Sequence, residues 1–426
     1  MTIAASQPAH LRDVPFMGVI FVLDEATKVG FALGDPDWIN LGQGQPEVGP
    51  LPDAPERIAR VDLEPSDHAY GPVSGTRELR EAVAAYYNDT FRRGRAGRYT
   101  ADHVAIVQGG RLALSRALAA LGETNVGYML PDYSAYEDML SLHLSRVTPV
   151  PVRTRPEDGF RLGAADLGGL VERSGVGAFL LSNPCNPTGA VISGERLDDL
   201  VRYAGASGCA LLVDEFYSHY HYVPGQAGQW LPAEGPVSAA AHVTDPDTDD
   251  VLIFDGLTKN FRYPGWRLGW VLGPPGTIAV IDRVGSGMDG GPSRLVQRAA
   301  LAALEPGYAR QETAAVRAEF ARKRNHAVAA LRDMGVVVDA EPAGTFYVWG
   351  CLDGLPAPLN DGMEFFRRAL EFKVITVPGQ LFDVNPGRRR RGASPYTSWM
   401  RFSFGPGYDA LTEGLDRLRQ MVAKHA

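Results

Sequence analysis

The stretch VLIFDGLTKNFRYPGWRLG at positions 251–269 joins a short apolar run to Lys259 and, eight residues further on, to Arg267. Residues Val251 to Phe254 have the length and side chains of a buried β-strand, which places Lys259 just beyond the end of that strand. An amine that forms a Schiff base with an aldehyde must be presented from a rigid element and kept partly neutral. A surface lysine on a loop has the same local pattern, so other parts of the chain have to decide between the two.

Four further apolar runs of strand length occur along the chain, separated by stretches with helical spacing. This alternation predicts an α/β fold in which a largely parallel sheet is covered by helices on both faces. The stretch from Ala233 to Asp250 is rich in Ala, Pro and Asp, and we expect it to be an exposed excursion. The predicted strands are Val104–Val107, Val126–Leu130, Ala178–Leu181 and Cys209–Val213, and the predicted helices include Leu112–Leu121 and Glu195–Ala204, the latter capped by Ser193.

The composition is that of an ordinary globular protein. The 426 residues exceed what one core normally supports, so two domains are expected, and the content of 45% hydrophobic and 22% charged residues excludes the disordered and fibrous classes. A net charge of -8 argues against a general nucleic-acid surface. The longest early apolar run, Met17 to Leu23, is far shorter than a membrane span of roughly 20 residues. Cys185, Cys209 and Cys351 are too widely spaced for a disulfide framework or a metal site, so we expect a cytoplasmic protein without metal, membrane or nucleic-acid partners.

An unusual polar or glycine-rich cluster follows each predicted strand, and in parallel sheets ligands bind where the carboxyl ends of the strands meet. Gln108-Gly109-Gly110-Arg111 opens a helix, and its free backbone amides suit an anion such as phosphate. The stretch SNPCNPTG at 182–189 contains two Asn-Pro pairs, which give a rigid turn that can aim the Asn186 amide. A plain strand-to-helix turn and a simple turn motif are the respective alternatives.

The cluster Asp214-Glu215-Phe216-Tyr217 follows the predicted strand that ends at Val213. A carboxylate at the end of a buried strand is costly unless it is paired, so Asp214 needs a cationic or hydrogen-bond-donating partner. A protonated pyridine nitrogen would serve, and Tyr217 could offer its phenol to an oxygen of the same ring. Taken singly, Asp214 could equally be a capping residue and Tyr217 a packed aromatic.

Together and in this order, NPCNPTG, DEFY and TK…GWRLG resemble the class I and II aminotransferases of pyridoxal phosphate fold type I. The resemblance runs from about Asn40 to Phe404, with weaker matches in LGQGQP at 41–46, YGPVSG at 70–75, PAGTFY at 342–347, VPG at 377–379 and RFS at 401–403. It implies a three-layer α/β fold with a mostly parallel central sheet in a large cofactor domain, residues 46–305. Residues 306–426 would form a smaller α+β domain, and residues 1–45 an N-terminal arm and part of that domain.

The resemblance also implies pyridoxal 5'-phosphate as the cofactor and a role for each matched residue. Lys259 would hold the cofactor as a Schiff base and later move a proton, while Asp214 would keep the pyridine nitrogen protonated. Asn186 and Tyr217 would hydrogen-bond the ring oxygen, and Arg401 would clamp the substrate α-carboxylate. The other implied contacts are Tyr133 on the ring face, Gly110, Arg111, Thr258 and Arg267 at the phosphate, Gly44 and Asn186 beside the substrate, and Tyr70 at the phosphate of a neighbouring subunit, hence a homodimer with shared sites.

The chain departs from the family pattern around the lysine. Gly256 stands where many members carry a serine, Arg111 where they often have a lysine or a small polar residue, and the bulky Arg262 and Tyr263 where residues are usually small or aliphatic, so we expect two bulky groups near the cofactor. The run Arg388 to Arg391 is either a solvated loop or a contact with an anion. These departures suggest an α-amino acid substrate unlike aspartate or the aromatic amino acids. Transamination is the favoured reaction, and β- or γ-elimination or replacement on the same scaffold is the alternative.

Overall fold

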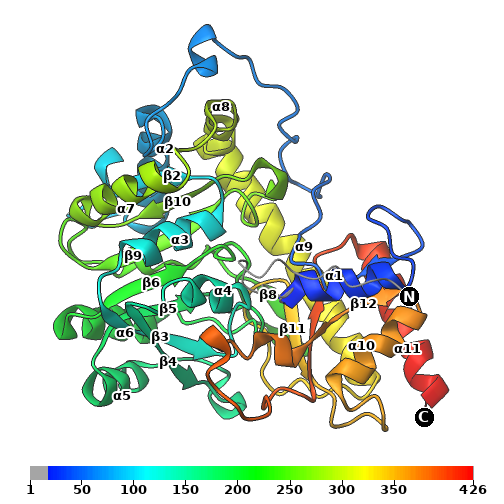
Figure 1. Cartoon of the computed structure of the whole chain (residues 1–426). Helices are drawn as coiled ribbons and strands as arrows, with labels where there is room; N and C mark the ends of the chain where they lie inside the picture. The colour runs from blue at the N-terminus through cyan, green and yellow to red at the C-terminus, as the bar shows by residue number, and fades with distance from the viewer. Residues whose placement is uncertain (1–17, 426) are drawn as a thin grey trace, which may run out of the picture.

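The computed structural model describes residues 18–425. Its main feature is a seven-stranded sheet with the order β2-β10-β9-β6-β5-β3-β4 (Figure 1). All neighbouring strands are parallel except β10, which is antiparallel to both β2 and β9, so the predicted mostly parallel sheet is confirmed. The strands are β2 (Val104–Val107), β3 (Thr124–Leu130), β4 (Val147–Arg153), β5 (Val176–Ser182), β6 (Ala210–Asp214), β9 (Val251–Gly256) and β10 (Gly269–Leu272).

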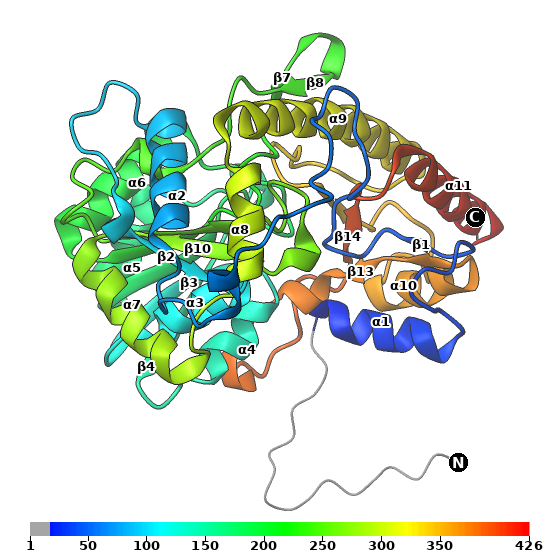
Figure 2. The ribbon, with the colours of Figure 1, turned by 90° about the horizontal axis from the view of Figure 1, so that it is seen from above.

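Helices cover both faces of this sheet (Figures 1 and 2). On one face α3 packs with α4 and α7, and on the other α5 packs with α6. After the edge strand β4 the chain turns back toward the middle of the sheet, and because crossovers are right-handed, α5 and α6, which follow β4, lie on the opposite face. Ser193 occupies the position before α6 as predicted, but its side chain makes no capping hydrogen bond. The helices are α2 (Arg77–Phe91), α3 (Gly110–Ala120), α4 (Ala135–Ser141), α5 (Ala164–Ser174), α6 (Gly194–Ser207), α7 (Pro275–Met288) and α8 (Arg294–Ala303).

The stretch from Ala233 to Asp250 is only partly the exposed excursion that its composition predicted: residues 244–250 are mostly exposed, whereas the part before them is mostly buried or half-buried. Val237, Ala239, Ala240 and Val243 are buried in the core. The fully buried Arg92 guanidinium donates hydrogen bonds to the carbonyl oxygens of Ala240 (2.8 Å) and Val243 (2.7 Å), which fastens the segment to the end of α2. Small side chains and a distant arginine, rather than local polarity, decide the position of this segment.

A smaller three-stranded antiparallel sheet, ordered β11-β14-β13, lies beside the large one, and β1 pairs with β12 in parallel (Figure 1). The long helix α9 runs from the large sheet toward the small one (Figure 2). The domain boundaries expected near residues 45 and 305 stay predictions. The elements are α1 (Gly18–Lys28), β1 (Ile39–Asn40), β7 (Tyr222–Pro224), β8 (Trp230–Pro232), α9 (Pro306–Asp333), β11 (Tyr347–Cys351), α10 (Gly362–Glu371), β12 (Val374–Ile375), β13 (Val377–Pro378), β14 (Trp399–Ser403) and α11 (Tyr408–His425).

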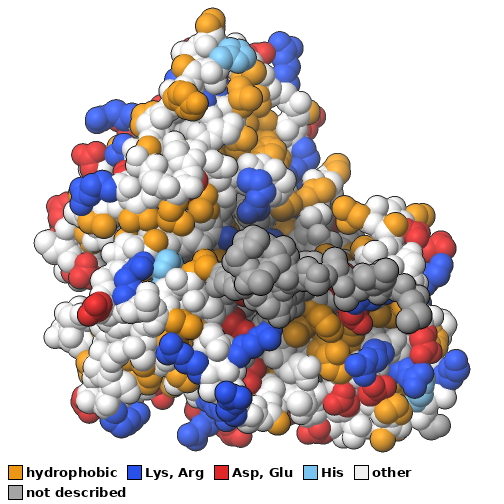
Figure 3. All heavy atoms as spheres, viewed as in Figure 1, with side chains coloured by type: hydrophobic (Ala, Val, Ile, Leu, Met, Phe, Trp, Pro, Cys, Tyr) orange, Lys and Arg blue, Asp and Glu red, His pale blue; other side chains and the backbone are white. Residues whose placement is uncertain are grey.

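The surface charge and the length of the helices can be compared with the predicted lack of nucleic-acid and membrane partners. On the face shown in Figure 3, basic and acidic side chains are interspersed and do not form a continuous basic area. Within residues 18–425, no helix is both long enough and apolar enough to cross a membrane.

Candidate active site

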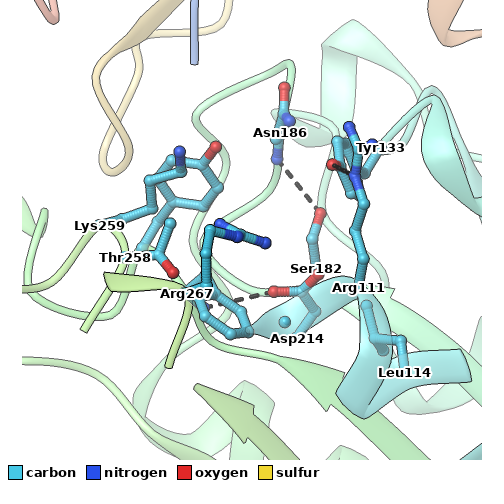
Figure 4. Close-up of a pocket in the computed structure, with 12 residues that line it drawn as sticks. Arg111, Leu114, Tyr133, Ser182, Asn186, Asp214, Thr258, Lys259 and Arg267 are labelled. Carbon is cyan, nitrogen blue, oxygen red and sulfur yellow. Dashed lines mark hydrogen bonds between the residues drawn. The ribbon is translucent and has the colours of Figure 1, made fainter. Parts of the chain in front are cut away.

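The clusters that follow the predicted strands converge on two adjoining cavities at one edge of the large sheet. The first, of about 320 Å³, lies at the carboxyl ends of β5, β6 and β9 and at the start of α3 (Figure 4). The second, of about 200 Å³, shares five residues with the first and extends to the small sheet. Of the predicted site residues, Gly110, Arg111, Tyr133, Asn186, Asp214, Tyr217, Thr258, Lys259 and Arg267 line the first cavity, and Gly44 and Arg401 line the second.

Lys259 projects into the region where the two cavities meet. Its Nζ donates a hydrogen bond to the Gly44 carbonyl oxygen, and its own carbonyl oxygen accepts one from the Tyr220 hydroxyl at 2.8 Å. Burial, followed by the positive charges of Arg267 and Arg401, lowers the pKa of Lys259 to about 7. A neutral amine is the nucleophilic form, so the site provides an amine that can attack an aldehyde near neutral pH.

The lowered pKa of Lys259 predicts how fast the apoenzyme takes up pyridoxal 5'-phosphate at different pH values. The neutral fraction of an ordinary lysine grows only near pH 10.5, whereas here it grows through about pH 7. We expect the rate of covalent attachment, measured after trapping with borohydride between pH 5.5 and 9, to rise through about pH 7 and to level off by about pH 9. A rate still rising steeply at the upper end of this range would contradict the lowered pKa.

Asp214 ends β6 and faces the first cavity (Figure 4). One carboxylate oxygen accepts a hydrogen bond from the Tyr136 hydroxyl at 2.8 Å and the other from the Phe216 amide at 3.3 Å. Burial raises the pKa of Asp214 to about 6, against the lowering effects of these hydrogen bonds and of Lys259. A buried carboxylate beside an open cavity suits a cationic donor on the bound group.

The other end of the first cavity is built for an anion. The N-terminus of α3 opens there, and its preceding residue Gly109 has a φ of 84°, where an added Cβ would lie 2.7 Å from an Arg267 nitrogen. The hydroxyl of Thr258 is buried without a hydrogen-bond partner in the described part of the chain. Helix amides, a guanidinium and an unpaired hydroxyl together fit a phosphate group.

Arg401 lies on β14 and is almost wholly buried, with 1% of its surface exposed. Its guanidinium donates to the Asn186 side-chain oxygen at 2.8 Å and to the Gly42 carbonyl oxygen at 2.5 Å, and it lies over the Tyr347 ring at 4.1 Å. Its Nε has no hydrogen-bond partner, and no carboxylate of residues 18–425 pairs with it. A buried cation with unused donors is a binding group for a carboxylate.

The structure adds site residues that sequence reasoning missed. The Tyr136 hydroxyl donates a hydrogen bond to the Asp214 carboxylate. Ser182 lines the first cavity, and its hydroxyl oxygen accepts a hydrogen bond from the Asn186 backbone amide at 3.2 Å. The Tyr347 hydroxyl lies 2.7 Å from the Tyr217 hydroxyl. Tyr347 lies in the matched PAGTFY stretch and Tyr136 three positions after Tyr133, so a signal existed in the motifs. Their contacts join residues far apart in the chain, which spacing alone does not reveal.

Asn260, directly after the lysine, is a further residue without a sequence signal. Its side-chain nitrogen, which carries two hydrogens, lies within hydrogen-bond distance of Asp255 at 2.7 Å, Ser218 at 2.9 Å and the Glu215 carbonyl oxygen at 3.1 Å. Its carbonyl oxygen lies 2.9 Å from Nδ1 of the fully buried His219. These bonds tie the lysine loop to the segment that follows Asp214.

We expect Asn260→Ala to lower the free energy of unfolding by about 2–3 kcal/mol, because it leaves buried polar groups unpaired. The loosened lysine loop should also lower kcat. Asn88→Ala is the matched control: Asn88 is likewise buried, but it bonds the Tyr99 backbone away from both cavities. Chemical denaturation and kinetics measure the two effects, and equal kcat values for the two variants would argue against a role for Asn260 in placing Lys259.

The departures around the lysine have structural reasons. A Cβ on Gly256 would lie 2.5 Å from both the Gly269 Cα and the Leu268 carbonyl oxygen, so the close approach of β9 and β10 excludes a serine there. The expectation that Arg262 and Tyr263 lie near the cofactor is wrong, since neither lines a cavity of the site.

Arg262 and Tyr263 point away from the site toward α9. Arg262 forms a fully buried ion pair with Glu312 at 2.7 Å and donates to the Gly49 carbonyl oxygen at 2.6 Å. The Tyr263 hydroxyl lies 2.6 Å from that of Tyr308 and accepts a hydrogen bond from the Ile58 amide at 2.9 Å. Both residues therefore fasten the lysine loop to α9 and to the segment around residues 49–58.

Tyr70 and the run Arg388 to Arg391, which the sequence singled out as possible contacts of an anion, lie outside the two cavities. Tyr70 is fully exposed and lines neither of them. In the run Arg388 to Arg391, Arg390 is half-buried and pairs with Asp383 at 2.8 Å, while Arg389 and Arg391 are exposed. The run lines neither cavity, so a solvated loop accounts for it better than contact with an anion in the site.

Comparison with known proteins agrees with this geometry. The family described as aminotransferase class I and II matches residues 36–418. An aspartate aminotransferase of Streptomyces avermitilis is 28% identical over 99% of both chains, and an aromatic-amino-acid aminotransferase 2 of Thermococcus litoralis is 27% identical over 90% of this chain and 91% of its own. A solved aminotransferase from Mycobacterium tuberculosis superposes with a TM-score of 0.77 at 25% identity, covering 96% of this chain and 97% of that one. The chain therefore belongs to the class I and II aminotransferases, enzymes that depend on pyridoxal 5'-phosphate.

Proposed function

We propose that this protein transfers the amino group of an α-amino acid to a keto acid, with pyridoxal 5'-phosphate attached to Lys259. One observation carries the proposal: an amine of lowered pKa, a buried carboxylate, an anion site and an unpaired buried arginine line two adjoining cavities. Elimination or replacement would use the same groups. The aminotransferase names of the relatives favour transamination.

The residues of the first cavity fit the cofactor. Arg267, Thr258 and the α3 N-terminus would hold its phosphate, Asp214 would hold the proton on its ring nitrogen, Asn186 and Tyr217 would contact its ring oxygen, and Tyr133 would cover its ring. When bound, the cofactor supplies a ring that takes up the charge left on the substrate α-carbon after proton loss.

The residues of the second cavity act on the substrate. Arg401 binds the α-carboxylate and so fixes the direction of the α-C–H bond, and Gly44 borders the same space. The Lys259 amine would take the α-proton at its Nζ and later give it up again, and its lowered pKa suits both transfers near neutral pH.

The second cavity also favours a class of side chain. Arg111 lines both cavities and donates to the Tyr133 hydroxyl at 3.0 Å, which leaves other donors of its guanidinium for a ligand. Arg262 and Tyr263, which had suggested an unusual substrate, lie outside the site, so Arg111 is the departure that bears on specificity. In place of the substrate unlike aspartate that the sequence suggested, we propose a dicarboxylic amino acid whose distal carboxylate meets Arg111. Asp138 shares that cavity and restricts the anion to the Arg111 side.

A substrate panel tests both the reaction and the substrate class. Holoenzyme is incubated with aspartate, glutamate, phenylalanine, serine or lysine, each with and without 2-oxoglutarate or oxaloacetate as acceptor. We expect amino transfer to be fastest from dicarboxylic donors and to require the acceptor for turnover. Ammonia released continuously without an acceptor would overturn transamination in favour of elimination, and faster transfer from phenylalanine would overturn the substrate class.

We further propose a cytoplasmic homodimer in which Tyr70 of the partner subunit completes the phosphate site. The full exposure of Tyr70 in the single chain and the three free cysteines support these proposals. Inactive Lys259→Ala and weakened Tyr70→Phe subunits are unfolded together and refolded as a mixture. We expect activity to return to about a quarter of wild type, since half of the dimers are mixed and each mixed dimer has one intact site. Activity equal to the mean of the separately refolded variants would count against shared sites.

A further inference from the structure

A third cavity, of about 620 Å³, lies between α2, the end of α8, the first turns of α9 and the segment 234–236, and we name it the α2–α9 cavity. Figure 2 shows α2, α8 and α9 side by side, and α8 packs against both of the others. It shares no lining residue with the two active-site cavities. Much of its wall is apolar, formed by Ala82, Ala85, Leu301, Leu304, Pro306 and Ala309.

Arg317 is the buried charge in this wall. Only 8% of its surface is exposed. One terminal nitrogen donates to the Glu234 carbonyl oxygen at 3.3 Å, while the other, Nη1, is buried with no hydrogen-bond partner among residues 18–425. No carboxylate in the part of the chain that the structure describes forms an ion pair with it. Burying a guanidinium without a counter-ion costs free energy that a bound anion would recover.

Two hydroxyl groups of the cavity wall are already engaged. The Tyr86 hydroxyl lies 2.7 Å from Nε2 of His219, and the Thr313 hydroxyl donates to the Ala309 carbonyl oxygen at 2.6 Å. At the exposed rim, Asp89 pairs with Arg98 at 3.6 Å and Glu305 accepts a hydrogen bond from the Tyr308 amide at 2.8 Å. Arg93, Arg310, Asp89, Glu234 and Glu305 give the rim charges of both signs, so the buried Arg317 sets the sign of the ligand.

We propose that the α2–α9 cavity binds a small organic carboxylate. Its carboxylate pairs with the Arg317 guanidinium, and its apolar body packs against the alanine and leucine side chains of α2, α8 and α9. An ordinary inorganic anion would satisfy the charge but leave the apolar wall uncovered. The inference does not depend on the proposed amino transfer, because no active-site residue contributes to it.

Calorimetric titration of the holoenzyme with phenylacetate, and with the neutral phenylacetamide as matched ligand, tests the proposal. The active site could also accept a carboxylate, so Arg401→Met is titrated in parallel. Two variants address the α2–α9 cavity. Arg317→Met removes the charge, and Ala85→Trp fills the space from the exposed face of α2 while leaving Arg317 in place.

We expect saturable binding of phenylacetate but not of phenylacetamide, weakened at least about tenfold in both Arg317→Met and Ala85→Trp and retained in Arg401→Met. Binding lost only in Arg401→Met assigns the ligand to the active site and overturns the proposal, as does no saturable binding at all. Binding abolished by Ala85→Trp but kept by a folded Arg317→Met would overturn the role of the charge. If Arg317→Met does not fold, Ala85→Trp decides, since unchanged binding in that variant excludes this cavity.

Discussion

Lys259→Ala is expected to lower the rate of amino transfer by about 10⁴-fold or more, since it removes both the covalent anchor of the cofactor and the proton-moving amine. We expect borohydride reduction to fix a cofactor link in the wild-type protein and not in the purified variant. Kinetics and mass spectrometry after reduction measure the two effects.

Lys28→Ala is the matched control, because Lys28 is an exposed lysine on α1 that pairs with Asp24 and Glu25 of the same helix. It should leave both the rate and the reduced link unchanged. Thermal unfolding should be little altered in Lys259→Ala, since within residues 18–425 its Nζ makes a single hydrogen bond, to the Gly44 carbonyl oxygen. A reduced cofactor link that persists in Lys259→Ala would place the attachment on another residue.

Asp214→Ala is expected to lower kcat by about 10²- to 10³-fold while the protein stays folded. Under the proposed function, the ring nitrogen of the cofactor would no longer be held protonated without this carboxylate, and the ring would take up less of the charge left on the α-carbon. Burial raises the pKa of Asp214 to about 6 and so disfavours its charge, and a large loss of stability is therefore not expected. Steady-state kinetics at saturating cofactor separates the effect on kcat from weaker cofactor binding.

Asp132→Asn tests whether the loss of kcat expected for Asp214→Ala requires a carboxylate that faces the cavity, or whether a change at any buried carboxylate would cause it. Asp132 is fully buried, burial raises its pKa to about 8, and it bonds Ser182 and the Tyr133 amide without lining either cavity. We expect this variant to retain most of its kcat. If Asp132→Asn and Asp214→Ala lost kcat equally, the effect would come from disturbed packing and not from a contact with the ring.

The strands with continuous apolar runs could be predicted, whereas β4 and β10 could not. The sequence of β4, VTPVPVR, contains two prolines, which a strand tolerates at the edge of a sheet, where β4 lies. β10 is a four-residue strand that directly follows the Arg267 loop and inserts antiparallel between β2 and β9. Its place depends on pairing with strands remote in sequence, which no local pattern reports.

The residues in and around the site likewise include some that could be predicted from the sequence and some that could not. Residues at strand ends, such as Lys259 and Asp214, could be predicted because a parallel sheet gathers those ends at one edge. Arg262 and Tyr263 could not be placed, because a loop residue three or four positions from the lysine can point to either side. The buried Glu312 on α9, fifty positions away, decided the side for Arg262.

The sequence by itself determined the family, the parallel sheet and the chemical groups of the site, because these follow from local patterns of apolar runs, glycines and motif order. Only the tertiary structure decided which polar groups stay unpaired. The free donors of Arg401, the unbonded hydroxyl of Thr258 and the buried Arg317 each result from contacts between distant segments. Such unmet hydrogen-bonding capacity is what a ligand satisfies, so binding sites become visible only once the chain is folded.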